Sequence, residues 1–177
     1  MKTLIKISDL HDSDSHVRAV TVIAHLTRHG SNIKPLVYRA PRFVATVVRL
    51  VGRSPSVDAR SHGCRVLRNL AGDPSCRYDL AYESGTIENL CLRARKGGTE
   101  ERGASIGALK NLASDPRNMI PMANAHDCLA TLIQMAHGGG GGGGGEHRND
   151  VTEDMQYLAC DALAMLSHWM RRSPPAG

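Results

Sequence analysis

Aromatic side chains are scarce in this sequence of 177 residues, which contains one Trp, one Phe and four Tyr, 3% of the chain. Hydrophobic residues still make up 41% of the sequence, so aliphatic side chains, Ala and Met must build the core. Such side chains suit close packing of helix against helix. The shortage of aromatic rings also disfavours a stacking surface of the kind that single-stranded nucleic acid requires.

Paired cysteines and catalytic patterns are missing as well. The five cysteines are an odd number without a Cys-x-x-Cys spacing, which argues against a zinc site and a disulfide scaffold. Cys64 and Cys160 occupy small apolar helix positions and are expected in the core of a protein in a reducing compartment. No zinc-protease, nucleophile-elbow or phosphate-loop pattern occurs. We therefore expect no enzymatic activity, no metal or cofactor, and no small-molecule substrate.

Long apolar runs are also absent. No stretch approaches 18 apolar residues, so the sequence predicts no transmembrane helix and no membrane partner. The first seven residues are followed at once by polar and acidic residues, which is too short and too polar a pattern for a signal peptide. Lys2 excludes N-myristoylation at this start. The expected location is cytoplasmic or nuclear.

The strongest positive feature is an internal repeat. Residues 63–74 (GCRVLRNLAGDP) recur as residues 107–116 (GALKNLASDP), so Asn69 and Asn111 lie 42 residues apart. A period of about 42 is typical of helical solenoids, in which each repeat packs on its neighbours.

Two weaker copies flank this pair. His25 takes the asparagine position 44 residues before Asn69, and Met165 takes it 54 residues after Asn111. The longer interval contains eight consecutive glycines, and removing about 12 inserted residues restores the period. We interpret residues 138–149 as a flexible Gly-rich insertion.

Each unit is predicted to contain a short, a medium and a long helix. The clearest example covers residues 77–84, 87–95 and 100–113, with Thr99 as the N-cap of the long helix. The first long helix is predicted at residues 17–28. HEAT repeats have two helices, so a three-helix unit favours the armadillo class.

Two sequence motifs, one of which occurs twice, resemble motifs of the armadillo family. Residues 83–87 (ESGTI) with Leu90 resemble that family's Glu-Ala-Gly turn and leucine-rich second helix. Residues 67–71 (LRNLA) and 109–113 (LKNLA) resemble its Ala-Leu-x-Asn-Leu-Ala third helix. The match covers nearly the whole chain.

The resemblance implies an all-α fold, a right-handed armadillo-type superhelix of about three full repeats plus a partial one. The expected organisation is armadillo repeats at 1–137, the Gly-rich insertion at 138–149, the third helix of the last repeat at 150–170, and a disordered tail at 171–177.

The resemblance also implies a binding surface. In armadillo proteins the third helices of successive repeats line a concave groove that holds extended peptides. The family's asparagine on each third helix typically forms a hydrogen bond with the peptide backbone. This role would fall to Asn69 and Asn111, with His25 at the equivalent position of the first copy. The alternative is that each amide bonds only its own helix or loop.

The distribution of charge favours an acidic segment of a partner protein. Between Arg39 and Arg102 the chain has 12 basic and 7 acidic residues, whereas the remainder has 10 of each. Arg65, Arg68 and Lys110 would suit acidic peptides if they face the groove, as in catenin-type armadillo proteins. A solvated convex face is the alternative interpretation of these charges.

Binding of basic nuclear localisation signals is a second hypothesis. Importin-alpha-like proteins place a tryptophan four residues before each asparagine, but here these positions hold other residues: Thr21, Arg65, Gly107 and Asp161. The missing tryptophans and the charge of Arg65 disfavour this hypothesis.

Two further alternatives concern other partners. Nucleic acid could bind the basic middle repeats, which is disfavoured because few aromatic residues lie among the basic ones. The chain also begins in mid-repeat and ends after a long third helix, without a polar cap. It is therefore expected to be part of a longer repeat protein or to stack end to end on another chain.

Overall fold

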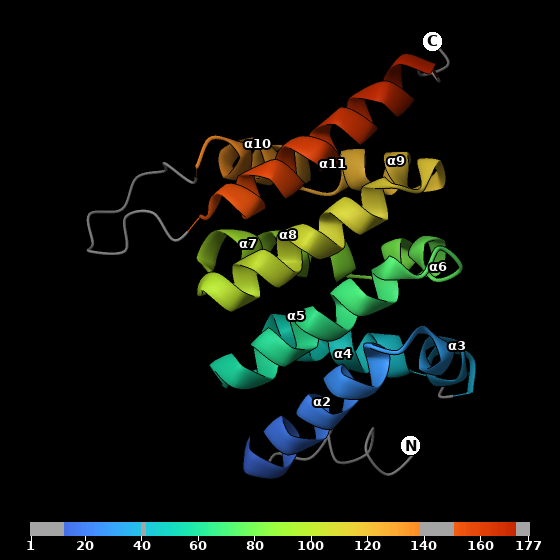
Figure 1. The fold of residues 1–177 in the computed structure, drawn as a ribbon, viewed down its shortest axis with the longest axis vertical. Coiled ribbons are helices and arrows are strands. Elements are labelled where there is room, and N and C mark those ends of the chain that lie inside the picture. Colours follow the sequence, from blue (N-terminus) through green and yellow to red (C-terminus); the bar gives the residue numbers. More distant parts are fainter. Residues whose placement is uncertain (1–12, 40–41, 139–150, 173–177) are drawn as a thin grey trace.

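The computed structural model describes residues 13–39, 42–138 and 151–172. Residues 1–12, nearly all of the predicted insertion and most of the predicted tail lie outside the described residues. The described helices stack into one elongated body (Figure 1). They are α2 (Ser13–Thr27), α3 (Gly30–Arg39), α4 (Phe43–Arg53), α5 (Val57–Gly72), α6 (Arg77–Tyr82), α7 (Thr86–Lys96), α8 (Thr99–Ala113), the 3-10 turn η1 (Pro116–Asn118), α9 (Met119–Asn124), α10 (Cys128–Ala136) and α11 (Glu153–Arg172).

These helices form three triplets and one single helix. The triplets are α3–α4–α5, α6–α7–α8 and α9–α10–α11, and among the described residues α2 is the third helix of a preceding partial repeat. The long helices α2, α5, α8 and α11 pack side by side in that order, and the short helices α3, α6 and α9 lie along one edge (Figure 1). The predicted all-α superhelix of three repeats plus a partial one is therefore confirmed.

Most helix boundaries follow the predicted ones, with small differences at the ends. The N-cap of α8 is Gly98, not Thr99, and the Glu101 carboxylate accepts the Gly98 N–H at 3.1 Å. The first long helix already begins at Ser13, and α11 continues through Arg172, two residues beyond its predicted end. Other ends are shorter than predicted: α6 ends at Tyr82 instead of residue 84, and α11 begins at Glu153 instead of residue 150. Local pattern defines helix ends less sharply than helix interiors.

One aliphatic core runs through the stacked repeats. Leu67 and Leu109, the leucines of the two clearest copies, are both fully buried. Cys64 is also fully buried, and burial raises the pKa of its thiol to about 11. The expectation for Cys160 was wrong: this residue lies on the exposed face of α11. Its small apolar character therefore did not mark a core position.

Some side-chain hydrogen bonds join residues that lie about one repeat apart in the sequence. Arg60 Nε donates to Glu101 Oε1 at 2.7 Å, and Asn89 Nδ2 donates to the Val48 carbonyl oxygen at 3.1 Å, each across 41 residues. The first bond joins the long helices α5 and α8 of neighbouring repeats, and the second joins the medium helices α4 and α7. They satisfy polar groups in the interface that would otherwise be costly to bury.

Within the described ranges, none of the helices has both the length and the apolar character needed to cross a membrane.

Candidate functional site

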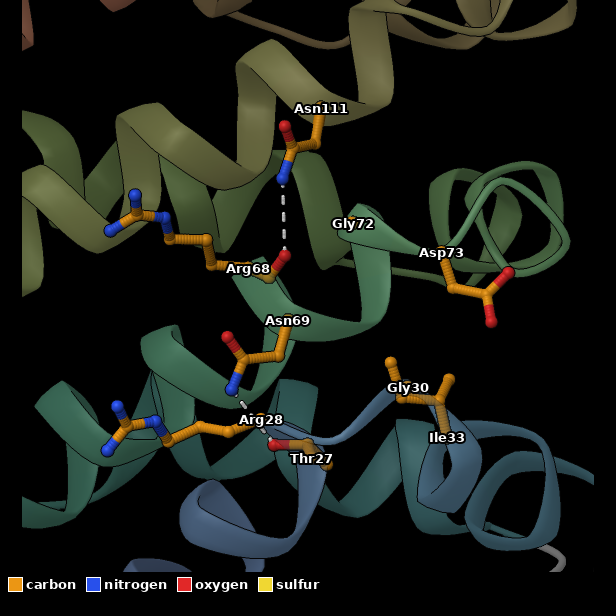
Figure 2. A pocket seen from close by; sticks show the side chains of 9 residues that line it. All are labelled: Thr27, Arg28, Gly30, Ile33, Arg68, Asn69, Gly72, Asp73 and Asn111. Atoms are coloured by element: carbon orange, nitrogen blue, oxygen red, sulfur yellow. Dashed lines mark hydrogen bonds between the residues drawn. The ribbon is translucent and has the colours of Figure 1, made fainter.

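Three long helices border two adjoining cavities on one face of the solenoid. One cavity has a volume of about 370 Å³ and the other about 280 Å³. The larger is lined by Thr27, Arg28, Gly30, Ile33, Arg68, Asn69, Gly72, Asp73 and Asn111 (Figure 2). The smaller is lined by Ala24, His25, Arg28, His62, Arg65, Arg68 and Asn69. The two share Arg28, Arg68 and Asn69, so they form one continuous depression, which we call the groove.

The asparagines lie in the groove and also join successive repeats. Asn69 Nδ2 donates to Thr27 Oγ1 at 3.1 Å and to the Ala24 carbonyl oxygen at 3.4 Å. Asn111 Nδ2 donates to the Arg68 carbonyl oxygen at 3.3 Å, and both amides point toward the preceding repeat in Figure 2. Each amide nitrogen therefore bonds the neighbouring repeat rather than its own helix.

The side-chain amide oxygens of Asn69 and Asn111 are available to accept hydrogen bonds. Neither Asn69 Oδ1 nor Asn111 Oδ1 has a hydrogen-bond partner among the described residues. The fixed nitrogen orients the amide, so its oxygen is a positioned acceptor at the wall of a cavity.

Two arginines give the groove its positive charge. Arg68 and Arg28 extend to the same side of Asn69 in Figure 2, while Asp73 lies at the opposite side. Neither guanidinium forms an ion pair with any described residue. The Asp73 carboxylate is occupied, because it accepts hydrogen bonds from the Ser75 side chain and N–H, and these bonds lower its pKa.

Arg68 also reaches across to the next repeat. A β-carbon built on Gly107 would lie 2.8 Å from Arg68 Nε and 3.1 Å from Arg68 Cδ. The side chain of Arg68 therefore lies flat against the α8 backbone, at the position where an importin-type protein would carry a tryptophan. Only a residue without a β-carbon allows this approach.

The other predicted site residues have mixed surroundings. Arg65 lines the smaller cavity but is paired with Glu100 on α8, and His25 lines the same cavity as an exposed side chain. Lys110 borders neither cavity, and its Nζ atom lies 3.8 Å from Asp161 Oδ2 on α11. The structure thus brings Asn69, Asn111, Arg68, Arg65 and His25 together and leaves Lys110 outside.

The sequence motifs did not assign Arg28, Thr27 or His62 to the groove. Thr27 lies 42 residues before Asn69, so the repeat period itself would have pointed to it. His62 is partly buried at the smaller cavity, and burial followed by the charge of Arg65 lowers its pKa. No repeated motif contains Arg28 or His62, which explains why pattern alone did not find them.

No metal centre is formed by the described side chains, since no three His, Cys, Asp or Glu residues among them gather closely enough to hold an ion.

The helix arrangement is similar to that of solved repeat proteins. The designed armadillo repeat protein YIII(Dq)4CqI superposes with a TM-score of 0.77 at 18% identity, over 93% of this chain and 63% of that one. The chain has the armadillo repeat fold. A second design, YIII(Dq.V1)4CPAF in complex with the peptide (KR)4, superposes with a TM-score of 0.77 at 17% identity, over 97% and 69% of the two chains.

A further similar structure is the crystal structure of an engineered protein. It superposes with a TM-score of 0.76 at 21% identity, over 94% of this chain and 62% of that one. This armadillo-fold chain thus spans about three fifths of the length of two of these proteins, 62% and 63%. No protein-family model and no curated protein matches the sequence.

Proposed function

We propose that this chain is a non-enzymatic interaction module that binds an extended segment of a partner protein in the groove. The observation that carries the proposal is the continuous depression across α2, α5 and α8, with a positioned amide oxygen from Asn69 and from Asn111. An extended segment presents backbone N–H groups along its length, and such groups can donate to these oxygens. The design that was solved with the peptide (KR)4 supports this general mode of binding.

We further propose that the segment is acidic. Arg28 and Arg68 face the groove without an ion-pair partner among the described residues, and they outnumber the one carboxylate that lines either cavity, Asp73. A guanidinium binds a carboxylate through parallel hydrogen bonds, which are stronger than bonds between neutral groups. A basic segment would meet repulsion here, so the charge of the groove disfavours a peptide such as (KR)4.

In this proposal Asn69 and Asn111 bind the backbone of the segment, and Arg28, Arg68, Arg65 and His25 bind its side chains. Lys110 is left out because Asp161 already lies beside it.

The experiment measures fluorescence anisotropy of three labelled decapeptides of equal length, one acidic, one basic and one neutral. The wild-type chain is compared with the double variant Arg28→Ala/Arg68→Ala. A matched control, Arg171→Ala/Arg172→Ala, removes the same charge from an exposed helix end. We expect the acidic peptide to bind most tightly, and its Kd to rise about tenfold, or about 1.4 kcal/mol, in the groove variant only.

Three results would contradict the proposal. Absence of binding by all three peptides to a folded chain would exclude the groove as a peptide site. Equal losses in both double variants would show that only net charge matters. Tightest binding of the basic peptide, with a Kd that changes in the groove variant, would contradict the acidic preference and support the adaptor-like alternative.

A further inference from the structure

The few tyrosines of this chain gather on an edge away from the groove. Three of the four are exposed on the short helices: Tyr38 on α3 is 60% exposed, Tyr82 on α6 is 52% exposed, and Tyr78 on α6 is 37% exposed. Ile120 on α9, 42 residues after Tyr78, is also 60% exposed. The helices α3, α6 and α9 lie one above the other in Figure 1, and we call the edge that they form the short-helix edge.

A small cavity opens on this edge between α3 and α6. Its volume is about 70 Å³, and none of its lining residues lines the groove. Five of its lining residues are apolar or thiol side chains: Val37, Val44, Leu70, Cys76 and Leu80. The other two are the acidic residues Asp79 and Glu83, one helical turn apart. An apolar interior with two carboxylates is the complement of a long side chain that ends in a positive charge.

The carboxylates are available for a partner. Neither Asp79 nor Glu83 forms an ion pair or side-chain hydrogen bond with another described residue. Asp79 is exposed and Glu83 is partly exposed. The acidic rim stands out in a chain whose middle repeats carry the whole positive excess.

The same edge already holds one cation in this way. The Arg117 guanidinium carbon lies 4.9 Å from the centre of the Tyr78 ring, and Arg117 Nη2 lies 2.7 Å from Asp115 Oδ2. A tyrosine face and a carboxylate thus bind a guanidinium together, which combines a cation–π contact with a charged hydrogen bond. Tyr82 packs against Tyr78 with ring centres 4.5 Å apart, and it lies three residues after Asp79 on the same helix.

We propose that the short-helix edge is a second docking surface, which takes a lysine or arginine side chain from a partner protein. The aliphatic stem of that side chain enters the 70 Å³ cavity, and its charged end lies between Asp79 and Glu83, beside Tyr82. The cavity is small, so it takes part of an unbranched stem. An acidic segment or a nucleic-acid phosphate would be repelled by the same two carboxylates.

The test uses a fluorescein-labelled octapeptide of alternating lysine and arginine, with an octapeptide of glutamates as the acidic counterpart. The double variant Asp79→Asn/Glu83→Gln removes the two charges while keeping side-chain size. The matched control Glu153→Gln/Asp154→Asn removes two exposed acidic charges from the first turn of α11. We expect the Kd of the basic peptide to rise about tenfold in the first variant and less than twofold in the control.

Three further variants separate this surface from other causes. Tyr82→Ala is expected to weaken the basic peptide about threefold, whereas Tyr157→Ala, which removes a tyrosine that is 69% exposed on α11, leaves it unchanged. The groove variant Arg28→Ala/Arg68→Ala is expected not to weaken binding of the basic peptide. This last result keeps the test independent of the proposed function, because the two surfaces share no lining residue.

Amide shifts in a two-dimensional NMR titration locate the peptide. We expect them to concentrate at the ends of α3 and on α6, around Val37 and Asp79. Shifts confined to α2, α5 and α8, or an unchanged Kd in a folded Asp79→Asn/Glu83→Gln chain, would overturn the proposal. Equal weakening in the α11 control would overturn it as well, since that would leave only a general effect of net charge.

Discussion

The side chain of Arg68 crosses the backbone of Gly107, so that a β-carbon on Gly107 would lie 2.8 Å from Arg68 Nε. The two residues belong to neighbouring repeats and are held in register by the hydrogen bond from Asn111 to the Arg68 carbonyl oxygen. The glycine thereby leaves room for an arginine where a related fold would carry a ring. The position of the Arg68 guanidinium therefore depends on this pair.

Gly107→Ala tests that dependence. We expect the new methyl group to push Arg68 aside and to weaken binding of the acidic decapeptide about threefold or more. The free energy of unfolding should change by no more than about 1 kcal/mol, because alanine favours the helix over glycine by about that amount. The control is Gly103→Ala on the same helix, where the added carbon meets only the flexible end of Met155. Equal affinities of the two variants would show that the placement of Arg68 does not matter.

Asn69→Ala should weaken the joint between two repeats without unfolding the helices. Its amide nitrogen bonds Thr27 and Ala24, so the substitution removes those bonds and costs about 1 kcal/mol. Urea unfolding followed by circular dichroism measures this cost, and Asn124→Ala, at an exposed end of α9, serves as the control with no expected change. A loss of helical signal in the absence of urea would mean that Asn69 is needed for folding itself.

Leu67→Ala and Leu109→Ala should each lower the free energy of unfolding by about 2–5 kcal/mol. Both side chains are fully buried between long and medium helices, so truncation leaves a cavity that the packed core fills only in part. Val57→Ala, at a side chain that is 54% exposed, should cost less than about 0.5 kcal/mol. Wild-type stability in either leucine variant would contradict the packing of the repeats described above.

Glu101→Ala should be far more damaging than the same change at its neighbour Glu100. The Glu101 carboxylate is 1% exposed and bonds Arg60 of the preceding repeat at 2.7 Å, so its removal leaves the charge of a partly buried arginine without its carboxylate partner. Loss of one member of a buried pair costs about 3–5 kcal/mol. Glu100 is exposed beside Arg65, and a surface pair contributes less than about 1 kcal/mol. Similar urea midpoints for the two variants would contradict this assignment.

Asp115 should make stability depend on acid pH. Hydrogen bonds from Arg117 are the largest cause that lowers the pKa of Asp115 below its ordinary value of 3.8. A carboxyl group whose pKa is lower in the folded state stabilises the fold above the unfolded-state pKa, and this contribution is lost as the pH falls through the folded-state pKa. The difference in stability between wild type and Asp115→Asn should therefore be largest at neutral pH and shrink below about pH 4. A difference that grows toward low pH would contradict the ion pair.

The sequence predicted the helical units well because their signals are local. Spacing of apolar residues, the Asp-Pro boundary at residues 115–116 and the recurrence of Asn69 at Asn111 all lie within a few helical turns. The Asp115 side chain accepts the Arg117 N–H at the start of η1. Residues 43–51 lie in helix α4 although their β-branched side chains would also suit a strand.

The candidate site could be predicted only in part. The sequence indicated the face on which Asn69, Asn111 and Arg68 lie, since all three belong to the repeated motif. It did not indicate that each asparagine uses its nitrogen on the preceding repeat, nor that Lys110 lies beside Asp161. These details depend on how far one long helix is displaced along and rotated about the next.

The sequence alone therefore determined the architecture: a period near 42, three helices in each unit, and an aliphatic core. The tertiary structure decided everything that joins one repeat to another, including the groove, the contact of Arg68 with Gly107 and the tyrosines of the short-helix edge. The physical reason is one of range. Helix formation follows from contacts three and four residues apart. The offset between repeats results from many small packing contacts between residues about 42 positions apart. It therefore cannot be predicted from any single stretch of the sequence.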